Sequence, residues 1–274
     1  MEPTITFSVR KIMTVMIVAV VLLHAMSLMQ TINAQRYAPE TLLQGQSHGL
    51  LRMFDVSGES NVPEWYSVIT LAFSSVLLII IGLNRKELHD KFARYWLFMG
   101  FVFAFLSLDE GACIHEGVGS LMSAHVKTGG ALSYGWVIPW GIFTIGFALL
   151  YVRFLLSLPR KTAVLMVIAG AIYVGGALGM ELVEGVLDEK FGALSLTEVI
   201  MRDIEEWGEM GGILLFNYTL LSYLKDQVGP VMISLGVSPS ATAIRVAPTA
   251  GRSRVRKSWR RRLTPGGQSR AGRL

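Results

Sequence analysis

Residues 65–83 read WYSVITLAFSSVLLIIIGL, nineteen residues without a charged side chain. About 20 apolar residues are what an α-helix needs to cross a hydrocarbon layer roughly 30 Å thick. Inside that layer a helix satisfies the hydrogen bonds of its own backbone, so helix is favoured here despite the many β-branched residues. The stretch therefore predicts a transmembrane helix.

Five further stretches have the same length and apolar character, in a chain of 274 residues that is 52% hydrophobic. The predicted spans are residues 12–32, 65–83, 92–116, 136–156, 163–184 and about 205–224. We therefore expect an all-α, polytopic membrane helix bundle with about six transmembrane helices in residues 12–225, and with an outer loop at 33–64. The first span follows Arg10 and Lys11, so a cleaved signal peptide is the alternative to an anchor. The length of the span and Ile32 at the expected cleavage site favour the anchor.

The short loops carry an uneven distribution of basic residues, which predicts the orientation. Ten Lys and Arg residues lie in the loops of one side and five in those of the other, with the C-terminal tail left out. The positive-inside rule then places both termini in the cytoplasm, including an N-terminal segment at 1–11. We expect a multi-pass protein of the inner (plasma) membrane, with Trp65, Tyr66, Trp136, Trp140 and Trp207 near its outer face.

The C-terminal segment 226–274 accounts for the net charge of +5. Residues 245–274 hold ten Lys and Arg residues and no acid, so the rest of the chain has 15 basic and 20 acidic residues. The composition of Ser, Ala, Pro, Gly and Arg predicts a disordered cytoplasmic tail. Its expected partners are anionic lipid headgroups of the bilayer, and nucleic acid is the disfavoured alternative.

Small and polar residues in the last two spans predict how these helices pack. Gly175 and Gly179 form one pair at a spacing of four, and Gly208 and Gly212 form another. Such pairs allow two helix backbones to approach closely. Asn217, in the middle of the sixth span, is interpreted as a hydrogen-bond partner between helices.

Three of the predicted spans carry ionisable side chains near one end. Each such group costs about 2.5–3.5 kcal/mol in a membrane helix, so it marks a functional site by default. The residues are Asp109, Glu110, His115, Glu116, Glu181, Glu184, Glu205, Glu206 and Glu209. The alternative interpretation is that they are solvated helix ends, which fits Glu184 best.

The direction of the spans places these residues at one depth. The third and fifth spans run outward and end with their acids, whereas the sixth runs inward and begins with them. All three sets are therefore expected in the outer third of the membrane. On a regular helix Asp109 and Glu116 would lie about 20° apart on one face. Cys113 lies between them and is interpreted as a small packing residue.

So many carboxylates in a low dielectric must be protonated, paired with cations or bound to metal. The basic side chains expected at that depth are Arg202, His115 and His24, which the acids outnumber. One or two metal ions are the simplest compensation, and oxygen-rich ligation with imidazole suits iron or manganese better than zinc or calcium. The predicted ligands are Asp109, His115, Glu116, Glu181, Glu184, Glu206 and Glu209, with Glu110 and Glu205 as general acid and base. By comparison with ferritin-like dimetal sites, a second histidine would come from His24, His48 or His125.

Three segments carry a resemblance to a known group of proteins. They are Asn61-Val-Pro-Glu-Trp-Tyr-Ser67, Leu106-Ser-Leu-Asp-Glu-Gly-Ala-Cys-Ile-His-Glu116 and Glu205-Glu-Trp-Gly-Glu-Met210. Together they resemble a family of uncharacterised bacterial multi-span membrane proteins, over residues 50–225. The Leu-Asp-Glu…His-Glu run is the most specific of the three. The resemblance implies no assigned activity.

Three functional hypotheses stay open on the sequence. The first is a membrane enzyme, a metal-dependent oxidoreductase or hydrolase acting on a lipid or other apolar substrate. The second is a transporter in which the acids relay protons or cations. The third is a non-catalytic subunit whose acids pair with other membrane subunits of a larger complex.

Overall fold

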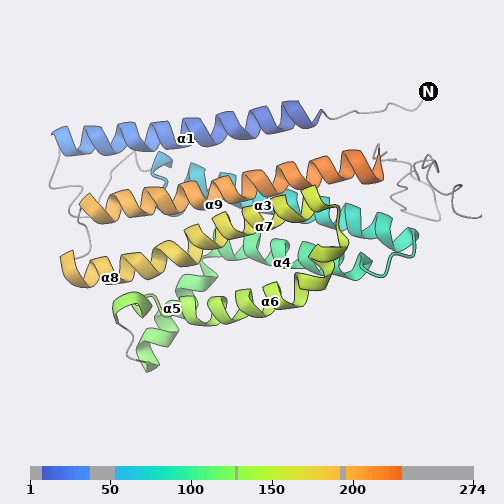
Figure 1. Cartoon of the computed structure of the whole chain (residues 1–274). Coiled ribbons are helices and arrows are strands. Elements are labelled where there is room, and N and C mark those ends of the chain that lie inside the picture. The colour runs from blue at the N-terminus through green and yellow to red at the C-terminus, as the bar shows by residue number, and fades with distance from the viewer. Residues whose placement is uncertain (1–7, 38–52, 127–128, 192–195, 230–274) are drawn as a thin grey trace, which may run out of the picture.

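The computed structural model describes residues 8–37, 53–126, 129–191 and 196–229. Within these ranges the chain forms helices and no strand, which confirms the predicted all-α fold. Figure 1 shows the long helices side by side along a common direction, with α1 at one edge and α6 at the other. The predictions for residues 1–7, for the part of the outer loop at 38–52, and for the tail at 230–274 fall outside the described residues.

The described helices include four segments that are long and apolar enough to cross a membrane. They are Val9–Ile32 within α1 (Val9–Tyr37), α3 (Val62–Glu87), α6 (Val137–Ser157), and Arg160–Lys190, which runs through α7 (Arg160–Val174), η3 (Gly175–Met180) and α8 (Glu181–Phe191). A fifth candidate is the bent pair of α4 (Ala93–Ala112) and α5 (Ile114–His125). These helices are those of a membrane protein.

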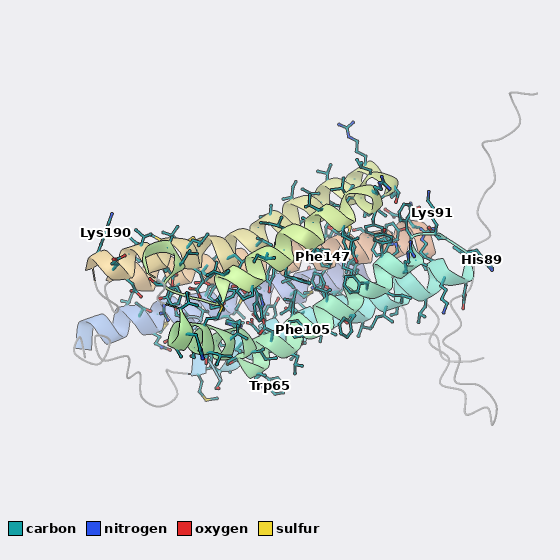
Figure 2. The ribbon with its side chains drawn as sticks, turned by 90° about the horizontal axis from the view of Figure 1, so that it is seen from below. Trp65, His89, Lys91, Phe105, Phe147 and Lys190 are labelled. Atoms are coloured by element: carbon teal, nitrogen blue, oxygen red, sulfur yellow. The ribbon has the colours of Figure 1, made fainter. Side chains whose placement is uncertain are left out.

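The predicted sixth span corresponds to α9 (Leu196–Tyr223), which continues into the short π-helix η4 (Leu224–Val228). Its first half carries Asp203, Glu205, Glu206 and Glu209, so it lies outside the four or five apolar segments. The count of six spans and the cytoplasmic location of the termini therefore stay predictions. Figure 2 places His89 and Lys91 at one end of the bundle and Lys190 at the other, which we refer to as the inner and outer ends.

The third predicted span is not one helix, and this prediction was wrong. Cys113 adopts left-handed backbone angles, φ 50° and ψ 42°, which a right-handed helix cannot continue. The chain turns there by 71° between α4 and α5. Asp109 and Glu116 consequently belong to different helices, and their predicted common face does not exist.

The fifth predicted span contains a π-helical segment, η3, immediately before Glu181. Beside it α7 and α9 approach so closely that a Cβ atom on Gly176 would lie 2.9 Å from the backbone of Glu205 and Glu209. Gly208 faces Gly176, and Gly212 faces the backbone of Tyr173, as the predicted close approach of α9 requires. The prediction that Gly175 and Gly179 make the close helix contact was wrong. Gly176, the residue after Gly175, makes the contact with the backbone of α9. π-helical turns are often found at functional sites.

The inner end of the bundle has a compact apolar core. Trp96 of α4, Phe154 of α6 and Leu220 of α9 are almost completely buried there, within one cluster. Nearer the middle, Asn217 of α9 hydrogen-bonds Ser74 of α3 at 3.0 Å, which confirms its predicted role between helices. These contacts fix α3, α4, α6 and α9 relative to one another and so position the outer end.

Candidate functional site: a carboxylate-lined cavity

A cavity of about 1300 Å³ lies among α4, α5, α6, α7, α8 and α9. Every side chain predicted for the site lines it: Asp109, Glu110, His115, Glu116, Glu181, Glu184, Glu205, Glu206 and Glu209. The structure therefore brings together residues from three predicted spans that are separated by up to a hundred positions in sequence. Their functions as metal ligands or as general acid and base stay predictions.

Asp109 is held by donors from two other elements. Its Oδ1 accepts a hydrogen bond from the backbone N–H of His115 at 2.8 Å and lies 3.4 Å from His115 Nδ1. Its Oδ2 accepts one from Trp140 Nε1 of α6 at 3.1 Å. The carboxylate thus stabilises the start of α5 and orients the imidazole of His115. A carboxylate behind a histidine is the usual support for a metal-binding imidazole.

The acids of α8 and α9 meet on the opposite wall of the cavity. Glu184 is only 3% exposed, and its side chain hydrogen-bonds Glu205 across the two helices. Arg202 Nε lies 3.8 Å from Glu184 Oε2. Glu181 follows the π-helical segment directly, and its buried Oε2 atom has no hydrogen-bond partner among the described residues. This wall therefore concentrates carboxyl groups beside one guanidinium, that of Arg202.

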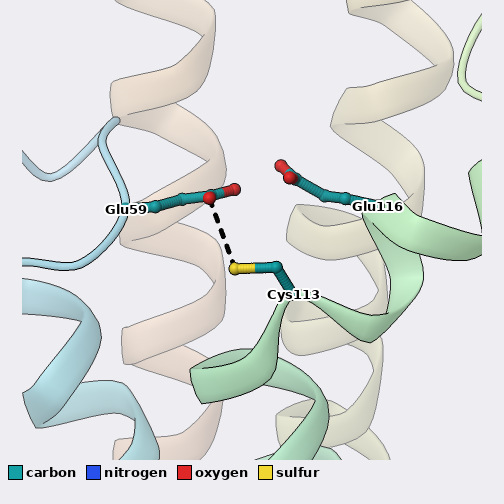
Figure 3. A group of neighbouring side chains, drawn as sticks. All are labelled: Glu59, Cys113 and Glu116. Atoms are coloured by element: carbon teal, nitrogen blue, oxygen red, sulfur yellow. Dashed lines mark hydrogen bonds between the residues drawn. The ribbon is translucent and has the colours of Figure 1, made fainter. Parts of the chain in front are cut away.

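A second group of side chains lies where α4 ends and α5 begins. Ligand atoms of Glu59, Cys113 and Glu116 all lie within 4.8 Å of one another, the one such group of three among the described residues. Figure 3 shows the three side chains pointing toward a common centre, with the Cys113 thiol donating to Glu59 Oε2 at 3.3 Å. The hydrogen bond with the Glu116 carboxyl lowers the pKa of Glu59. Two carboxylates and a thiolate would suit a metal ion.

Two members of this group, Glu59 and Cys113, were missed as site residues on the sequence. Glu59 lies in the loop before α3, where Asn61 caps the helix by accepting from the backbone N–H of Glu64 at 3.0 Å. Asn61 Nδ2 also donates to the backbone carbonyl of Asp55 at 2.6 Å, which fixes the loop against the helix start. The Asn-x-x-Glu spacing was therefore a signal that Glu59 lies at the outer end. No signal indicated Cys113, since its role depends on the helix break.

Two of the tryptophans expected near the outer face, Trp136 and Trp140, line the cavity. Trp136 is 7% exposed, and its ring lies 4.8 Å from that of His115. Trp140 binds Asp109, as described above. In contrast, Trp65 is 69% exposed, in keeping with a position at the membrane interface. The aromatic side chains of α6 therefore enclose the acids from a third side.

The second histidine proposed for a dimetal site does not come from His24 or His125, since neither lines the cavity. His24 of α1 is buried against the ring of Trp207, with centroids 3.9 Å apart. His125 lies at the end of α5, and its Nδ1 atom bonds to the backbone carbonyl of Leu121. His48 lies outside the described residues. A metal centre in this cavity would therefore use one described imidazole, that of His115.

The fold and the cavity define a helical membrane protein with a carboxylate-lined chamber at one end of its bundle. The chain belongs to a family described as a domain of unknown function, DUF8692, which matches residues 13–224. This agrees with the resemblance to an uncharacterised family that has no assigned activity. No curated protein and no solved structure matches the chain.

Proposed function

We propose that the chain is a metal-dependent enzyme of the bacterial inner membrane that oxidises or hydrolyses a lipid or other apolar substrate. The observation that carries the proposal is the composition of the cavity wall. Ten carboxyl groups line the cavity, together with one guanidinium and one imidazole. Because unpaired charges are costly in such surroundings, bound cations are the simplest way to stabilise this arrangement.

The group of Glu59, Cys113 and Glu116 is the first candidate position for an ion, because its ligand atoms are already close together. His115 lies beside it and is oriented by Asp109. A thiolate added to oxygen and imidazole ligands favours iron or zinc over manganese and calcium. Iron is therefore the metal that best fits both the predicted ligand set and this group.

The acids of α8 and α9 are the second candidate position. Glu181, Glu184, Glu206 and Glu209 would bind an ion across the cavity from the first, and Glu205 would act with Glu110 as general acid and base. A bound metal would supply Lewis acidity or, for iron, redox chemistry. The residues of the chain would hold the substrate, exclude water and move protons.

A carrier is less well supported than an enzyme. A transport path would have to connect the acids with the inner end of the bundle. The cavity reaches some members of the apolar cluster there, such as Tyr151 and Met166, but Trp96, Phe154 and Leu220 lie outside its lining and are each 0–1% exposed. A cavity with a polar end and a packed floor is suited to holding a substrate during a reaction.

Metal analysis of the purified full-length protein tests the proposal. We expect at least one iron or zinc ion per chain in the wild type, and its loss in the double variant Glu59→Gln, Glu116→Gln. Glu189→Gln is the matched control, because Glu189 lies on α8 but does not line the cavity. Wild-type protein that binds no metal after reconstitution with iron, manganese or zinc would contradict the proposal.

A further inference from the structure

The cavity extends far beyond its acids, toward the inner end of the bundle. On α4 the lining continues from Asp109 back to Phe98, and on the α7–α8 segment from Glu181 back to Met166. At 1.5 Å per residue these distances are about 16 Å and 22 Å. One acyl chain of a bilayer lipid extends over about 15 Å, half of the roughly 30 Å hydrocarbon core. The chamber is therefore as deep as a single lipid tail is long.

The deep part of the cavity is lined by aromatic and aliphatic side chains. Phe98, Phe105, Phe143, Phe147 and Met166 belong to it, and Figure 2 places Phe105 and Phe147 between the two ends of the bundle. The volume of about 1300 Å³ exceeds the range of roughly 300–1,000 Å³ that holds most small ligands. Such a wall favours a hydrocarbon occupant.

Some side chains that line the cavity on α4 and α6 are also exposed on the outside of the bundle. Two hydrogen bonds join these helices, from Trp140 Nε1 to Asp109 Oδ2 near the outer end and from the Tyr151 hydroxyl to the carbonyl of Tyr95 near the inner end. Between them the rings of Phe98 and Phe147 lie with their centroids 6.4 Å apart. The joints are eleven residues apart on α6, about 16 Å. Between them, Phe98 and Phe143 line the cavity and are also 44% and 48% exposed. A tail in the bilayer can therefore enter without crossing water.

The charge at the outer end restricts the polar group of the occupant. Ten carboxyl groups face one guanidinium, Arg202, and that group already lies beside Glu184. Carboxylates there that are ionised would repel a phosphate or sulfate. A hydroxyl, carbonyl, amide or amine would find hydrogen-bond acceptors or opposite charge.

We propose that the cavity binds the single hydrocarbon tail of an amphiphile with an uncharged or cationic polar end, which enters between α4 and α6. The polar end lies among the acids and the tail extends along α7 toward Met166. The amphiphile is the substrate class of the proposed enzyme, so this inference rests on the proposed function. Binding of the tail is nevertheless a separate property from binding of metal.

The chain offers a matched pair of variants to test the position of the tail. Gly170 on α7 lines the cavity, whereas Gly146 on α6 does not, and a Cβ atom at either would meet nothing within 4 Å. Gly170→Phe would fill the chamber about 16 Å below Glu181, and Gly146→Phe would add the same ring on the lipid side. Thr144→Trp provides a second blocking variant from the opposite wall.

The experiment uses full-length protein in nanodiscs that contain hexadecanol with a photoreactive diazirine at the end of its tail. Mass spectrometry then locates the labelled peptides, with hexadecylamine, hexadecyl phosphate and octanol as competitors. We expect labelling around Met166 in the wild type and in Gly146→Phe, and at least a tenfold loss in Gly170→Phe or Thr144→Trp. Hexadecylamine should compete, and hexadecyl phosphate and octanol should not.

Two results would overturn this inference: equal labelling in the blocked and control variants, or labelling confined to lipid-facing residues such as Leu149. Equal competition by the phosphate would overturn the assignment of the polar end. Metal content measured on the same samples keeps the two proposals distinct. Metal without tail labelling leaves the enzyme proposal standing, and tail labelling without metal leaves the binding site standing. A thermal unfolding scan of each variant confirms that it is folded.

Discussion

The two ends of the bundle differ in almost every physical respect. At the inner end, helices pack through large apolar side chains such as Trp96, Phe154 and Leu220, which are 0–1% exposed. At the outer end, the chain bends sharply between α4 and α5, and a π-helical segment lies between α7 and α8. Carboxyl groups there take the place of apolar side chains. The difference indicates that the inner end provides stability and that the outer end uses part of it to hold the carboxylate-lined cavity.

Removing a large side chain from the inner end should produce the largest loss of stability. Trp96→Ala leaves a void in the apolar cluster and is expected to cost about 3–5 kcal/mol. Unfolding in detergent followed by circular dichroism measures this cost. Leu149→Ala is the control, because Leu149 is 70% exposed on α6 and should change stability by less than about 1 kcal/mol. Equal effects of the two variants would remove the distinction between core and lipid-facing positions.

The close contact between Gly176 and the backbone of α9 lies between the two ends of the bundle. Disrupting it should cause the second largest loss of stability. Gly176→Ala would force a methyl group against the backbone of α9 and is expected to cost about 1–3 kcal/mol. It should also reduce metal content, because Glu205 and Glu209 belong to the displaced backbone. Gly175→Ala should be close to neutral, since a Cβ atom there meets nothing within 4 Å. The comparison fails if both variants behave alike.

At the outer end, replacing an acid should increase the stability of the metal-free protein, whereas the substitutions above decrease it. Glu206→Gln removes one negative charge from a crowded cavity and is expected to stabilise the metal-free protein by on the order of 1 kcal/mol. The same variant should weaken metal binding at the position between α8 and α9. Thermal unfolding with and without chelator separates the two effects. A variant that is less stable than the wild type in chelator would show that the acid contributes to folding.

The smallest of these effects is expected at Asn217, between the two ends. Asn217→Leu keeps a similar shape and removes two hydrogen bonds, the one that Asn217 accepts from Ser74 and the one that it donates to the backbone carbonyl of Thr70. Hydrogen bonds between membrane helices contribute about 0.6 kcal/mol on average. A double-mutant cycle with Ser74→Ala measures the interaction directly. A coupling energy of zero would mean that the two side chains pack together without a stabilising bond.

The apolar pattern was enough to predict the all-α fold and the segments that form its long helices. Because membrane helices begin and end where apolar runs do, the acids of residues 109–116, 181–184 and 205–209 could be assigned to one depth. Their meeting in one cavity follows from that depth together with helix packing. The local irregularities could not be predicted in the same way.

The break at Cys113 is an example, since nothing in Gly-Ala-Cys-Ile excludes a continuous helix. The left-handed turn is stabilised by contacts from elsewhere, among them the bonds of Asp109 to His115 and Trp140. The shift of the close glycine contact from Gly175 to Gly176 likewise depends on the π-helical segment. Periodicity in sequence assumes regular helices and fails where tertiary contacts stabilise irregular ones.

We propose that the cavity at the outer end of the bundle binds metal, at the group of Glu59, Cys113 and Glu116 and at the acids of α8 and α9. Anomalous diffraction at the iron edge from crystals of iron-loaded full-length protein tests it most directly. We predict a peak inside the cavity, within bonding distance of Glu116 and of a second ligand. That second ligand is Glu59, Cys113 or an acid of α8 or α9. A map with no peak there, or with iron bound only on the surface away from these side chains, would contradict the account.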